Sequence, residues 1–252
     1  MTGLLAHICR HPIKSIGWEA LPSVDLTAGK ALPSDRKWAL AHQAAEFSAP
    51  PDKWYAKRNF VRGVAAPALM AVRATLSDDL NWIALTHPNA APIEFAPDTE
   101  AGSAALVAWI APMWPENRPA PARLVRVPDQ AMTDRPEPFV SILNVESNRD
   151  LGARVGQDLS IHRWRGNLWL DGVAPFEEFD WIGRRIRIGN AVLRIEQRIT
   201  RCNATKANPA TGIADIDTLG ALKAAFGHQD FGVYARVVAG GHLHLGDRIE
   251  LL

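Results

Sequence analysis

The sequence predicts a mainly β protein of the α+β class, in which antiparallel, barrel-like sheets are accompanied by a few helices. Short apolar runs separated by Pro, Gly and Ser occur along most of the chain, at the spacing typical of strands. Regular alternation of strands and helices, which would indicate a parallel sheet, is absent. With 252 residues, 47% of them hydrophobic, the chain is long enough to bury a large core without disulfides.

The first third of the chain is predicted to be β, followed by one helix. Seven prolines then lie between Pro112 and Pro138, and proline is excluded from helix interiors and central strands. We therefore expect an N-terminal β-barrel-like domain over residues 1–115 and a second domain, an antiparallel β-barrel, over residues 116–252. The elements expected before the boundary are strands over 4–9, 24–26, 37–40, 69–76 and 82–86, and a helix over 104–110.

The second domain is predicted to contain two hairpins and two helices. Gly189-Asn190 supplies the positive φ of a tight hairpin turn, and Gly240-Gly241 is expected to do the same in a closing hairpin. Asn144 or Ser147, and Asp217, are of the residue types that cap helices. The elements expected are a strand over 139–143, helices over 145–155 and 217–226, and hairpins of 184–188 with 191–199 and of 232–238 with 242–251.

Composition and charge exclude several classes of protein. The 28 Lys and Arg residues balance 27 Asp and Glu residues, and no run of cations exceeds two, so neither a nucleic-acid partner nor a membrane partner is expected. Cys9 and Cys202 are too few for a secreted disulfide framework, which makes a reducing cytoplasm the expected location. An anionic ligand would have to be held by cations that converge locally.

The common catalytic motifs are missing from the sequence. It contains no Gly-x-Ser-x-Gly, no Walker-type loop, no Gly-x-Gly-x-x-Gly and no His-Glu-x-x-His, which removes most support for hydrolase, nucleotide-binding and zinc-protease functions. His7, Cys9 and His11 alternate along a predicted strand, but three such residues span about 13 Å and cannot all bind one ion without a bend. We expect them to be core residues, and we expect the same of the pair His242 and His244.

Four groups of motifs, in this order, resemble the MOSC family, the molybdenum cofactor sulfurase C-terminal domain, preceded by its N-terminal β-barrel partner. The resemblance covers nearly the whole chain and extends to proteins like the amidoxime-reducing components. The motifs are His11-Pro12-Ile13-Lys14-Ser15 with Ser34-Asp35-Arg36-Lys37-Trp38, then Arg163-Trp164-Arg165-Gly166-Asn167 with Asp171-Gly172, then Arg201-Cys202 with Asn208-Pro209-Ala210-Thr211-Gly212, and finally Phe231-Gly232-Val233-Tyr234-Ala235 with Leu245-Gly246-Asp247.

The resemblance implies a molybdenum cofactor, Mo-molybdopterin, bound between the two β domains; pyridoxal phosphate is not expected. The residues suit such a ligand, because a buried phosphate needs charge-assisted donors from several directions. Lys14, Ser15 and Arg36 are of the right types to supply them. Arg165 and Asn167, expected at positions i and i+2 on one face of a strand, would bind the edge of the pterin.

Cys202 is the predicted catalytic residue and metal ligand. A soft thiolate from the protein would complete the coordination of molybdenum, and the neighbouring Arg201 would favour the thiolate. Thr200 and Arg201 are included in the expected cofactor site. Many members of the family have a second cysteine a few residues earlier, where this chain has residues 198–200 without one, so a relay between two thiols is not expected.

The function that the resemblance implies is reduction of N-hydroxylated or other N-oxygenated small molecules, with electrons from a separate flavin or iron–sulfur protein. Two alternatives remain open at this stage. One is a sulfurtransferase or sulfur carrier that holds a persulfide on Cys202, and the other is a non-enzymatic carrier of the molybdenum cofactor. The molybdenum content of the purified protein and its turnover with an artificial electron donor would distinguish the three.

Overall fold

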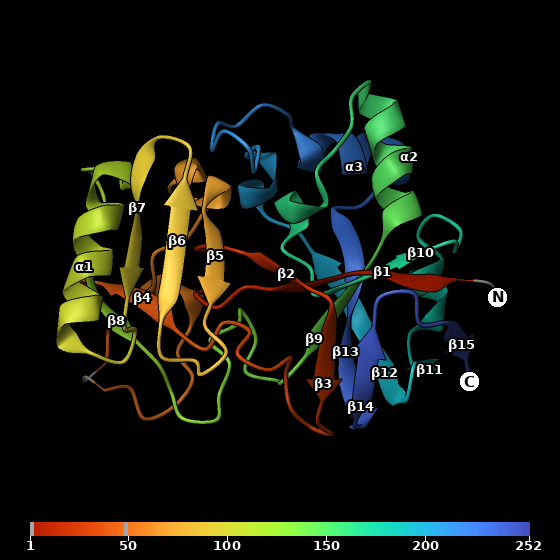
Figure 1. Ribbon diagram of the computed structural model, residues 1–252. Coiled ribbons are helices and arrows are strands. Elements are labelled where there is room, and N and C mark those ends of the chain that lie inside the picture. Colours follow the sequence, from red (N-terminus) through yellow and green to blue (C-terminus); the bar gives the residue numbers. More distant parts are fainter. Residues whose placement is uncertain (1–2, 48–49) are drawn as a thin grey trace.

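The computed structural model describes residues 3–47 and 50–252 and is mainly β, as predicted (Figure 1). Its largest feature is an eight-stranded sheet with the strand order β15-β11-β12-β13-β9-β10-β1-β2. The bounds of these strands are β1 Leu4–Arg10, β2 Glu19–Leu21, β9 Val140–Asn144, β10 Leu168–Asp171, β11 Arg185–Ile188, β12 Ala191–Thr200, β13 Asp230–Ala239 and β15 Ile249–Leu251.

The large sheet curls until its two ends meet. The amide of Leu5 in β1 donates to the carbonyl of Asp247 (2.9 Å), and the amide of Gly246 donates back to Leu5 (2.8 Å), just ahead of β15. The prediction that all its strands are antiparallel is wrong, because β9 and β10 run parallel. The chain between these two strands forms helix α2 (Val145–Val155) and the short 3-10 helix η4 (Ile161–Trp164), the kind of crossover that a parallel pair requires.

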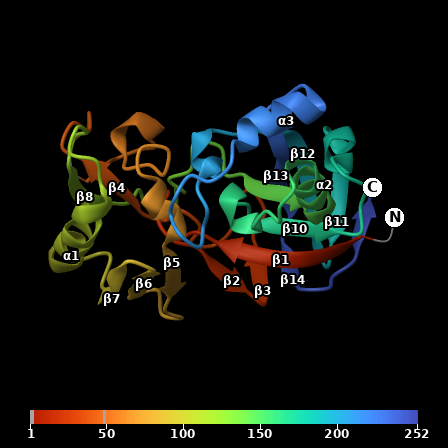
Figure 2. The same cartoon turned by 90° about the horizontal axis from the view of Figure 1, so that it is seen from above.

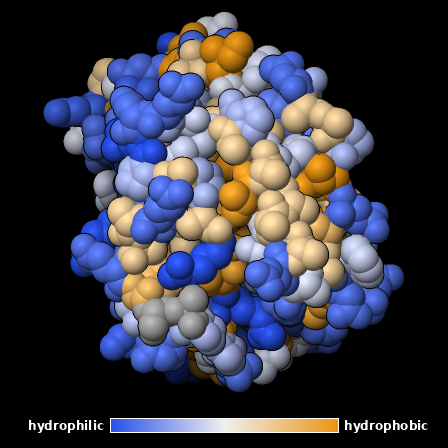
Figure 3. Space-filling model, turned by 90° about the vertical axis from the view of Figure 1, so that its left-hand side faces the viewer, coloured by the Kyte–Doolittle hydropathy of each residue, from blue (hydrophilic) through white to orange (hydrophobic). Residues whose placement is uncertain are grey.

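A smaller unit lies beside the large sheet (Figure 2). The outer side of its helix α1 (Glu100–Ile110), seen in Figure 3, exposes several alanines among charged side chains, whereas Leu106 and Ile110 are buried in the core of the unit. The other elements of the unit are β4 Ala39–His42 paired with β8 Pro121–Val125, the sheet β5 Arg73–Leu76, β6 Ile83–His87 and β7 Ala90–Phe95, and the 3-10 helices η1 Lys57–Asn59, η2 Pro67–Ala71 and η3 Ala111–Met113.

The strand pairing crosses the expected boundary between residues 115 and 116 in both directions. β1 and β2 belong to the large sheet, and β3 (Ser23–Leu26) pairs with β14 (Gly241–His244). In the opposite direction, β8 returns to pair with β4 of the smaller unit. The division at residues 115 and 116 stays a prediction, but the large sheet clearly needs both ends of the chain.

The predicted helices and the central hairpin are confirmed. Helix α2 begins at its cap Asn144, whose side chain accepts from the amide of Glu146, and ends at Gly156 in the left-handed conformation. Helix α3 (Thr218–Phe226) is capped by Asp217. The hairpin of β11 and β12 turns at Gly189, whose φ is 53°. The 3-10 helices η5 (Glu177–Trp181) and η6 (Asn203–Lys206) occupy two of the remaining connections.

The predicted closing hairpin is wrong. After β13, strand β14 pairs with β3, and β15 pairs with β11. Gly240 and Gly241 mark close approaches of the backbone, not a tight turn: a Cβ on Gly240 would lie 2.6 Å from the carbonyl oxygen of Leu26, and one on Gly241 would lie 2.5 Å from the carbonyl carbon of Asn190. Similarly, the expected strand over 69–76 is only half right, because η2 precedes β5 there.

Among the described residues, no helix is long and apolar enough to cross a membrane.

The core of the larger unit contains one carboxyl group that lacks an ionic partner. Glu178 in η5 is fully buried, and its Oε2 accepts a hydrogen bond from the Asn144 amide (3.1 Å), whereas Oε1 has no partner among the described residues. Burial raises the pKa of Glu178 to about 7. An acid with a raised pKa is more protonated in the folded state, so its contribution to stability is greatest below its unfolded pKa and falls as the pH rises.

We therefore predict that Glu178→Gln flattens the pH dependence of stability between pH 4.5 and 7. At pH 8 the variant should be more stable than the wild type by up to about 3 kcal/mol, since one pKa unit corresponds to about 1.4 kcal/mol. Urea unfolding at a series of pH values measures this difference. Glu94→Gln, at an exposed glutamate of β7, is the control and should keep the wild-type slope. A wild-type slope for Glu178→Gln would show that the buried carboxyl does not cause the pH dependence.

Candidate functional site

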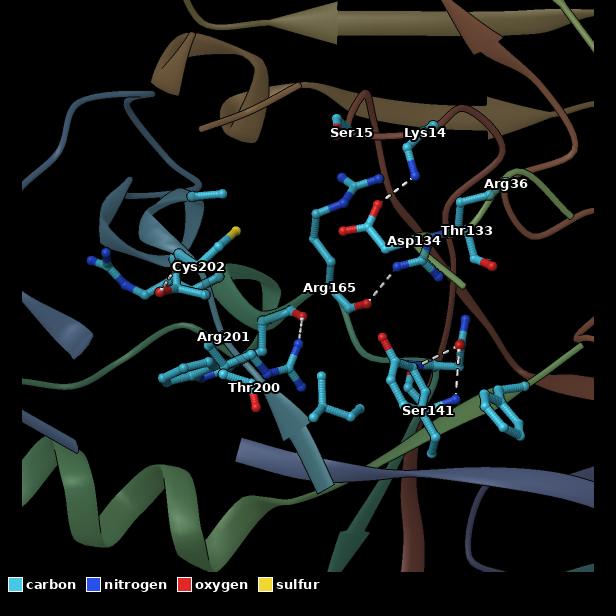
Figure 4. A pocket seen from close by; sticks show the side chains of 18 of the residues that line it. Lys14, Ser15, Arg36, Thr133, Asp134, Ser141, Arg165, Thr200, Arg201 and Cys202 are labelled. Atoms are coloured by element: carbon cyan, nitrogen blue, oxygen red, sulfur yellow. Dashed lines mark hydrogen bonds and ion pairs between the residues drawn. The ribbon is translucent and has the colours of Figure 1, made fainter. Parts of the chain in front are cut away.

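A cleft of about 900 Å³, part of it open to solvent, lies where loops of the smaller unit meet the larger unit (Figure 4). Its walls come from seven separate segments of the chain. The structure brings together in this one cleft all eight residues that the sequence analysis selected: Lys14, Ser15, Arg36, Arg165, Asn167, Thr200, Arg201 and Cys202.

Lys14 and Ser15 are the two central residues of a tight turn. Its ends are joined by a hydrogen bond from the amide of Ile16 to the carbonyl of Ile13 (3.2 Å), and both isoleucines are fully buried. Ser15 has φ 62°, Arg36 has φ 47° and Arg165 has φ 50°. Residues other than glycine rarely adopt this left-handed backbone conformation, and those that do cluster at ligand sites. Three loops of the cleft thus hold strained residues.

The Lys14 ammonium is buried and already has two partners. It donates to the carbonyl of Met132 (2.9 Å) and to the carboxylate of Asp134, which points toward it in Figure 4. Burial lowers the pKa of Lys14, and Asp134 opposes this shift. Burial alone would raise the pKa of Asp134, but Lys14 and the more distant Lys57 hold it below its ordinary value. Asp134 is therefore ionised at neutral pH, and it forms an ion pair with Lys14.

Arg36 and Arg165 link the two sides of the cleft. The Arg36 guanidinium donates to the carbonyl of Arg165 (2.7 Å), while Arg165 donates to the carbonyls of Gly17 (3.0 Å) and Ile13 (3.3 Å). Burial, followed by the nearby Arg36, lowers the pKa of Arg165 to about 9. Both guanidiniums are cations at neutral pH, and each is oriented by backbone of the opposite loop.

Asp35 is the carboxylate that stabilises this pair of cations. It accepts from Arg36, from the amide of His11 (2.8 Å) and from the His11 ring Nδ1 (3.3 Å). Burial alone would raise the pKa of Asp35, but Arg36 and His11 hold it well below its ordinary value. Burial and the two arginines lower the pKa of His11, so its imidazole is neutral.

Asn167 has a different environment from the one expected. Arg165 ends the 3-10 helix η4, and Asn167 lies just before β10, so the two residues are not at positions i and i+2 of a strand. The Asn167 side chain accepts from the amide (3.2 Å) and hydroxyl (2.8 Å) of Ser141 and donates to the carbonyl of Cys9 (3.2 Å). These bonds connect the segment after η4 to β9 and β1. They occupy the carbonyl oxygen and one N–H of the Asn167 side-chain amide.

The opposite side of the cleft carries the exposed thiol of Cys202, which lies at the start of η6. The Arg201 side chain turns away from solvent and donates to the carbonyls of Phe231 (2.8 Å from Nε) and Trp164 (2.7 Å). Burial lowers its pKa to about 10, so it too is a cation. The Thr200 hydroxyl donates to Asp230 (2.6 Å). That Arg201 favours a Cys202 thiolate stays a prediction.

Cys9 and its neighbours do not form a metal site. A bulge in β1 between Leu5 and His7 leaves His7 exposed, whereas Cys9 and His11 are buried. Burial raises the pKa of Cys9 to about 12. The expectation that these residues belong to the core is confirmed for Cys9 and His11 and is wrong for His7.

Sequence reasoning missed several residues of the cleft. Asp134 lies in the proline-rich segment, where no motif indicated it, and it is the partner of Lys14. Tyr234 stacks on Phe139 with a centroid separation of 5.3 Å, and burial raises its pKa. Arg163 also lines the cleft, but it forms an ion pair with Asp215 (2.8 Å) that fixes the loop after η6. Asp35 and Tyr234 lay inside the quoted motifs without an assigned role.

The charges that line the cleft do not balance. Apart from the pair of Arg163 with Asp215, which neutralise each other, they are four cations and two carboxylates, a surplus of two positive charges. The cations are Lys14, Arg36, Arg165 and Arg201, and the carboxylates are Asp35 and Asp134. The cleft is therefore suited to an anion that carries about two negative charges.

We predict that Asn167→Ala destabilises the protein by about 2 kcal/mol, because it leaves the Ser141 amide and the Cys9 carbonyl without their side-chain partner in the interior. Thr200→Ala, which removes an exposed hydroxyl of the same cleft, should change stability by less than about 0.5 kcal/mol. Urea unfolding measures both variants. Equal stability of the two would contradict the structural role of Asn167.

Comparison with known proteins agrees with this description. Residues 129–250 match the MOSC domain family. The chain is 31% identical to molybdenum cofactor sulfurase from Anopheles gambiae over 124 residues, 44% of this chain and 16% of that protein. It is 28% identical to mitochondrial amidoxime-reducing component 1 from Mus musculus over 154 residues, 55% of this chain and 44% of that protein.

The chain thus spans less than half the length of these curated relatives. The crystal structure of the YUAD protein from Bacillus subtilis superposes over the whole chain with a TM-score of 0.47 and 13% sequence identity. Five of the eight selected residues, from Arg165 to Cys202, lie within the matched segment. The match to the MOSC domain family covers residues 129–250, just under half of this chain.

Proposed function

We propose that the cleft binds the molybdenum cofactor and that the protein reduces N-oxygenated small molecules with electrons from a separate flavin or iron–sulfur protein. The observation that carries the proposal is the convergence of four cations and one exposed thiol in a single cleft. The similarity to an amidoxime-reducing component over 55% of the chain supports the reaction class.

The donors around the Lys14 turn fit a terminal phosphate. Lys14 has one N–H beyond the two that bind Met132 and Asp134, and Arg36 has further N–H groups beyond those that bind Asp35 and Arg165. The Ser15 hydroxyl makes no hydrogen bond to any described residue and lines the same wall.

The opposite wall fits the metal end of the cofactor. Cys202 presents the only exposed thiol among the described residues, and a soft thiolate is a suitable ligand for molybdenum. When bound, the cofactor supplies the two-electron chemistry. The chain's own residues bind and orient it: Lys14, Ser15 and Arg36 at the phosphate, Arg165 beside the pterin, and Cys202 at the metal. Phe139 and Tyr234 restrict water on the apolar side.

A sulfur carrier is the second candidate, because the match to a molybdenum cofactor sulfurase and the exposed Cys202 both suit a persulfide at this position. Cys9 is buried and lines no part of the cleft, so Cys202 would act without a second thiol. About one molybdenum per chain in protein made by a cofactor-sufficient cell supports the oxidoreductase or a cofactor carrier, and turnover with an artificial electron donor separates those two.

We predict that Lys14→Ala lowers the molybdenum and pterin content of the purified protein at least about tenfold, since losing one partner of a desolvated phosphate costs roughly 2–5 kcal/mol. The matched control is Lys57→Ala, which removes an exposed ammonium 3.6 Å from the same Asp134 and should keep the wild-type content. Metal analysis and pterin fluorescence measure both. Wild-type content in Lys14→Ala would place the phosphate elsewhere.

We predict that Cys202→Ala abolishes reduction of an amidoxime while part of the pterin remains bound, because the phosphate donors lie on the other wall. Cys9→Ala also removes one thiol, but from the core, and its activity per bound molybdenum should equal that of the wild type. Reduction rates with an artificial donor, divided by molybdenum content, provide the comparison. Full activity of Cys202→Ala would overturn the ligand assignment.

A further inference from the structure

Two histidines converge on the outer face of the two-stranded sheet of β3 and β14. His242 and His244 are two residues apart on β14, with buried Leu243 between them facing the core. Their side chains therefore leave the strand on the same side. Their Nε2 atoms are 3.0 Å apart, and the ring planes are inclined by 62° with centroids 4.2 Å apart. The tips of the two rings thus meet at one point near the surface.

A carboxylate fixes the tautomer of the first histidine. His242 lies directly opposite Asp25 in the register of β14 with β3, and its Nδ1 is 2.6 Å from the Asp25 carboxylate. Because a carboxylate accepts, Nδ1 carries the proton and Nε2 presents its lone pair. Carboxylates that orient histidines in this way are typical of metal ligands.

The second histidine is held by its backbone. The amide of His244 donates to the Asp247 carboxylate (2.8 Å), across a turn in which Gly246 has φ 86°. The backbone of His244 is consequently fixed at the end of a short strand, and among the described residues its exposed ring contacts only the His242 ring, which Asp25 orients.

The separation of the two nitrogens indicates which ions fit. With metal–imidazole bonds of about 2.0–2.1 Å, a separation of 3.0 Å corresponds to an N–metal–N angle of roughly 90–97°. This is the angle between neighbouring positions of a square-planar or octahedral ion, and Ni²⁺ and Cu²⁺ prefer such geometry with nitrogen ligands. A tetrahedral ion would require a wider separation.

We propose that His242 and His244 form a two-nitrogen site for a divalent cation of the nickel–copper type, with water at its other positions. None of the residues that line the molybdenum-cofactor cleft belongs to β3 or β14, so the site is independent of the proposed function. It corrects the expectation that these two histidines are core residues: His242 is half-buried and His244 is exposed.

The experiment is a calorimetric titration of the tag-free protein with Ni²⁺, which does not oxidise the Cys202 thiol. We expect saturable binding of one Ni²⁺ per chain. His242→Ala and His244→Ala should each weaken binding at least about tenfold, because chelation is lost, and Asp25→Asn should weaken it by up to about tenfold. The matched control is His42→Ala, which removes a histidine from β4 of the smaller unit and should bind as the wild type does.

A second measurement on the wild type avoids any effect of the substitutions on folding. Ni²⁺ is paramagnetic, so substoichiometric Ni²⁺ should broaden the proton NMR signals of the His242 and His244 rings before those of other histidines. Absence of saturable binding would overturn the proposal and leave the close contact as a hydrogen bond between two rings. Binding that persists in both His variants, or that is lost in Cys202→Ala, would overturn it equally.

Discussion

The cleft depends on two half-buried arginines that join its loops through hydrogen bonds to the backbone. Arg36 donates to the backbone of the Arg165 loop, and Arg165 donates to the backbone on both sides of the Lys14 turn. These bonds connect the loop of Arg165 to the loop of Arg36 and to the Lys14 turn. The two units therefore meet partly through hydrogen bonds to carbonyl groups and not only through apolar contacts. Loss of either side chain would leave buried carbonyls without partners, a cost of about 1–3 kcal/mol for each group.

This contact also determines what the cleft can bind. Burial, followed by the nearby Arg36, lowers the pKa of Arg165 to about 9, because a cation is unfavourable where it is desolvated and close to another cation. Asp35 and Asp134 offset part of this cost. A bound anion would offset more of it, so the same residues favour a doubly charged ligand. The left-handed residues Ser15, Arg36 and Arg165 place these groups where regular strands would not.

Sequence reasoning predicted the local features of this protein better than the contacts between distant segments. Helix α2, with its Asn144 cap and Gly156, follows from side chains within a few residues of one another, as does the hairpin at Gly189. The pairing of β14 with β3 could not be predicted, because it joins residues more than 200 positions apart and depends on the close approach of Gly240 to Leu26.

The candidate site shows the same contrast. The motifs selected residues that the fold brings into one cleft, but they did not indicate what each side chain contacts. Asn167 was expected to face a ligand, and its amide instead bonds to Ser141 and Cys9. Asp134 stood in a segment without periodicity or motif, so only the folded chain reveals it as the partner of Lys14. Tertiary hydrogen bonds of this kind leave no local pattern in a sequence.

The position of β1 has a consequence for folding during synthesis. β1 leaves the ribosome long before its partners, because it pairs with β10 and bonds to residues around Asp247, near the other end of the large sheet. At roughly 5–20 residues per second, β1 waits on the order of 10–50 seconds for that partner. During this time Leu5 and Ile8 lack their partners in β10, although β2 can already pair with Ile8. The smaller unit, whose strands lie between Ala39 and Val125, can already collapse. The large sheet therefore closes last, and the cleft forms only when it does.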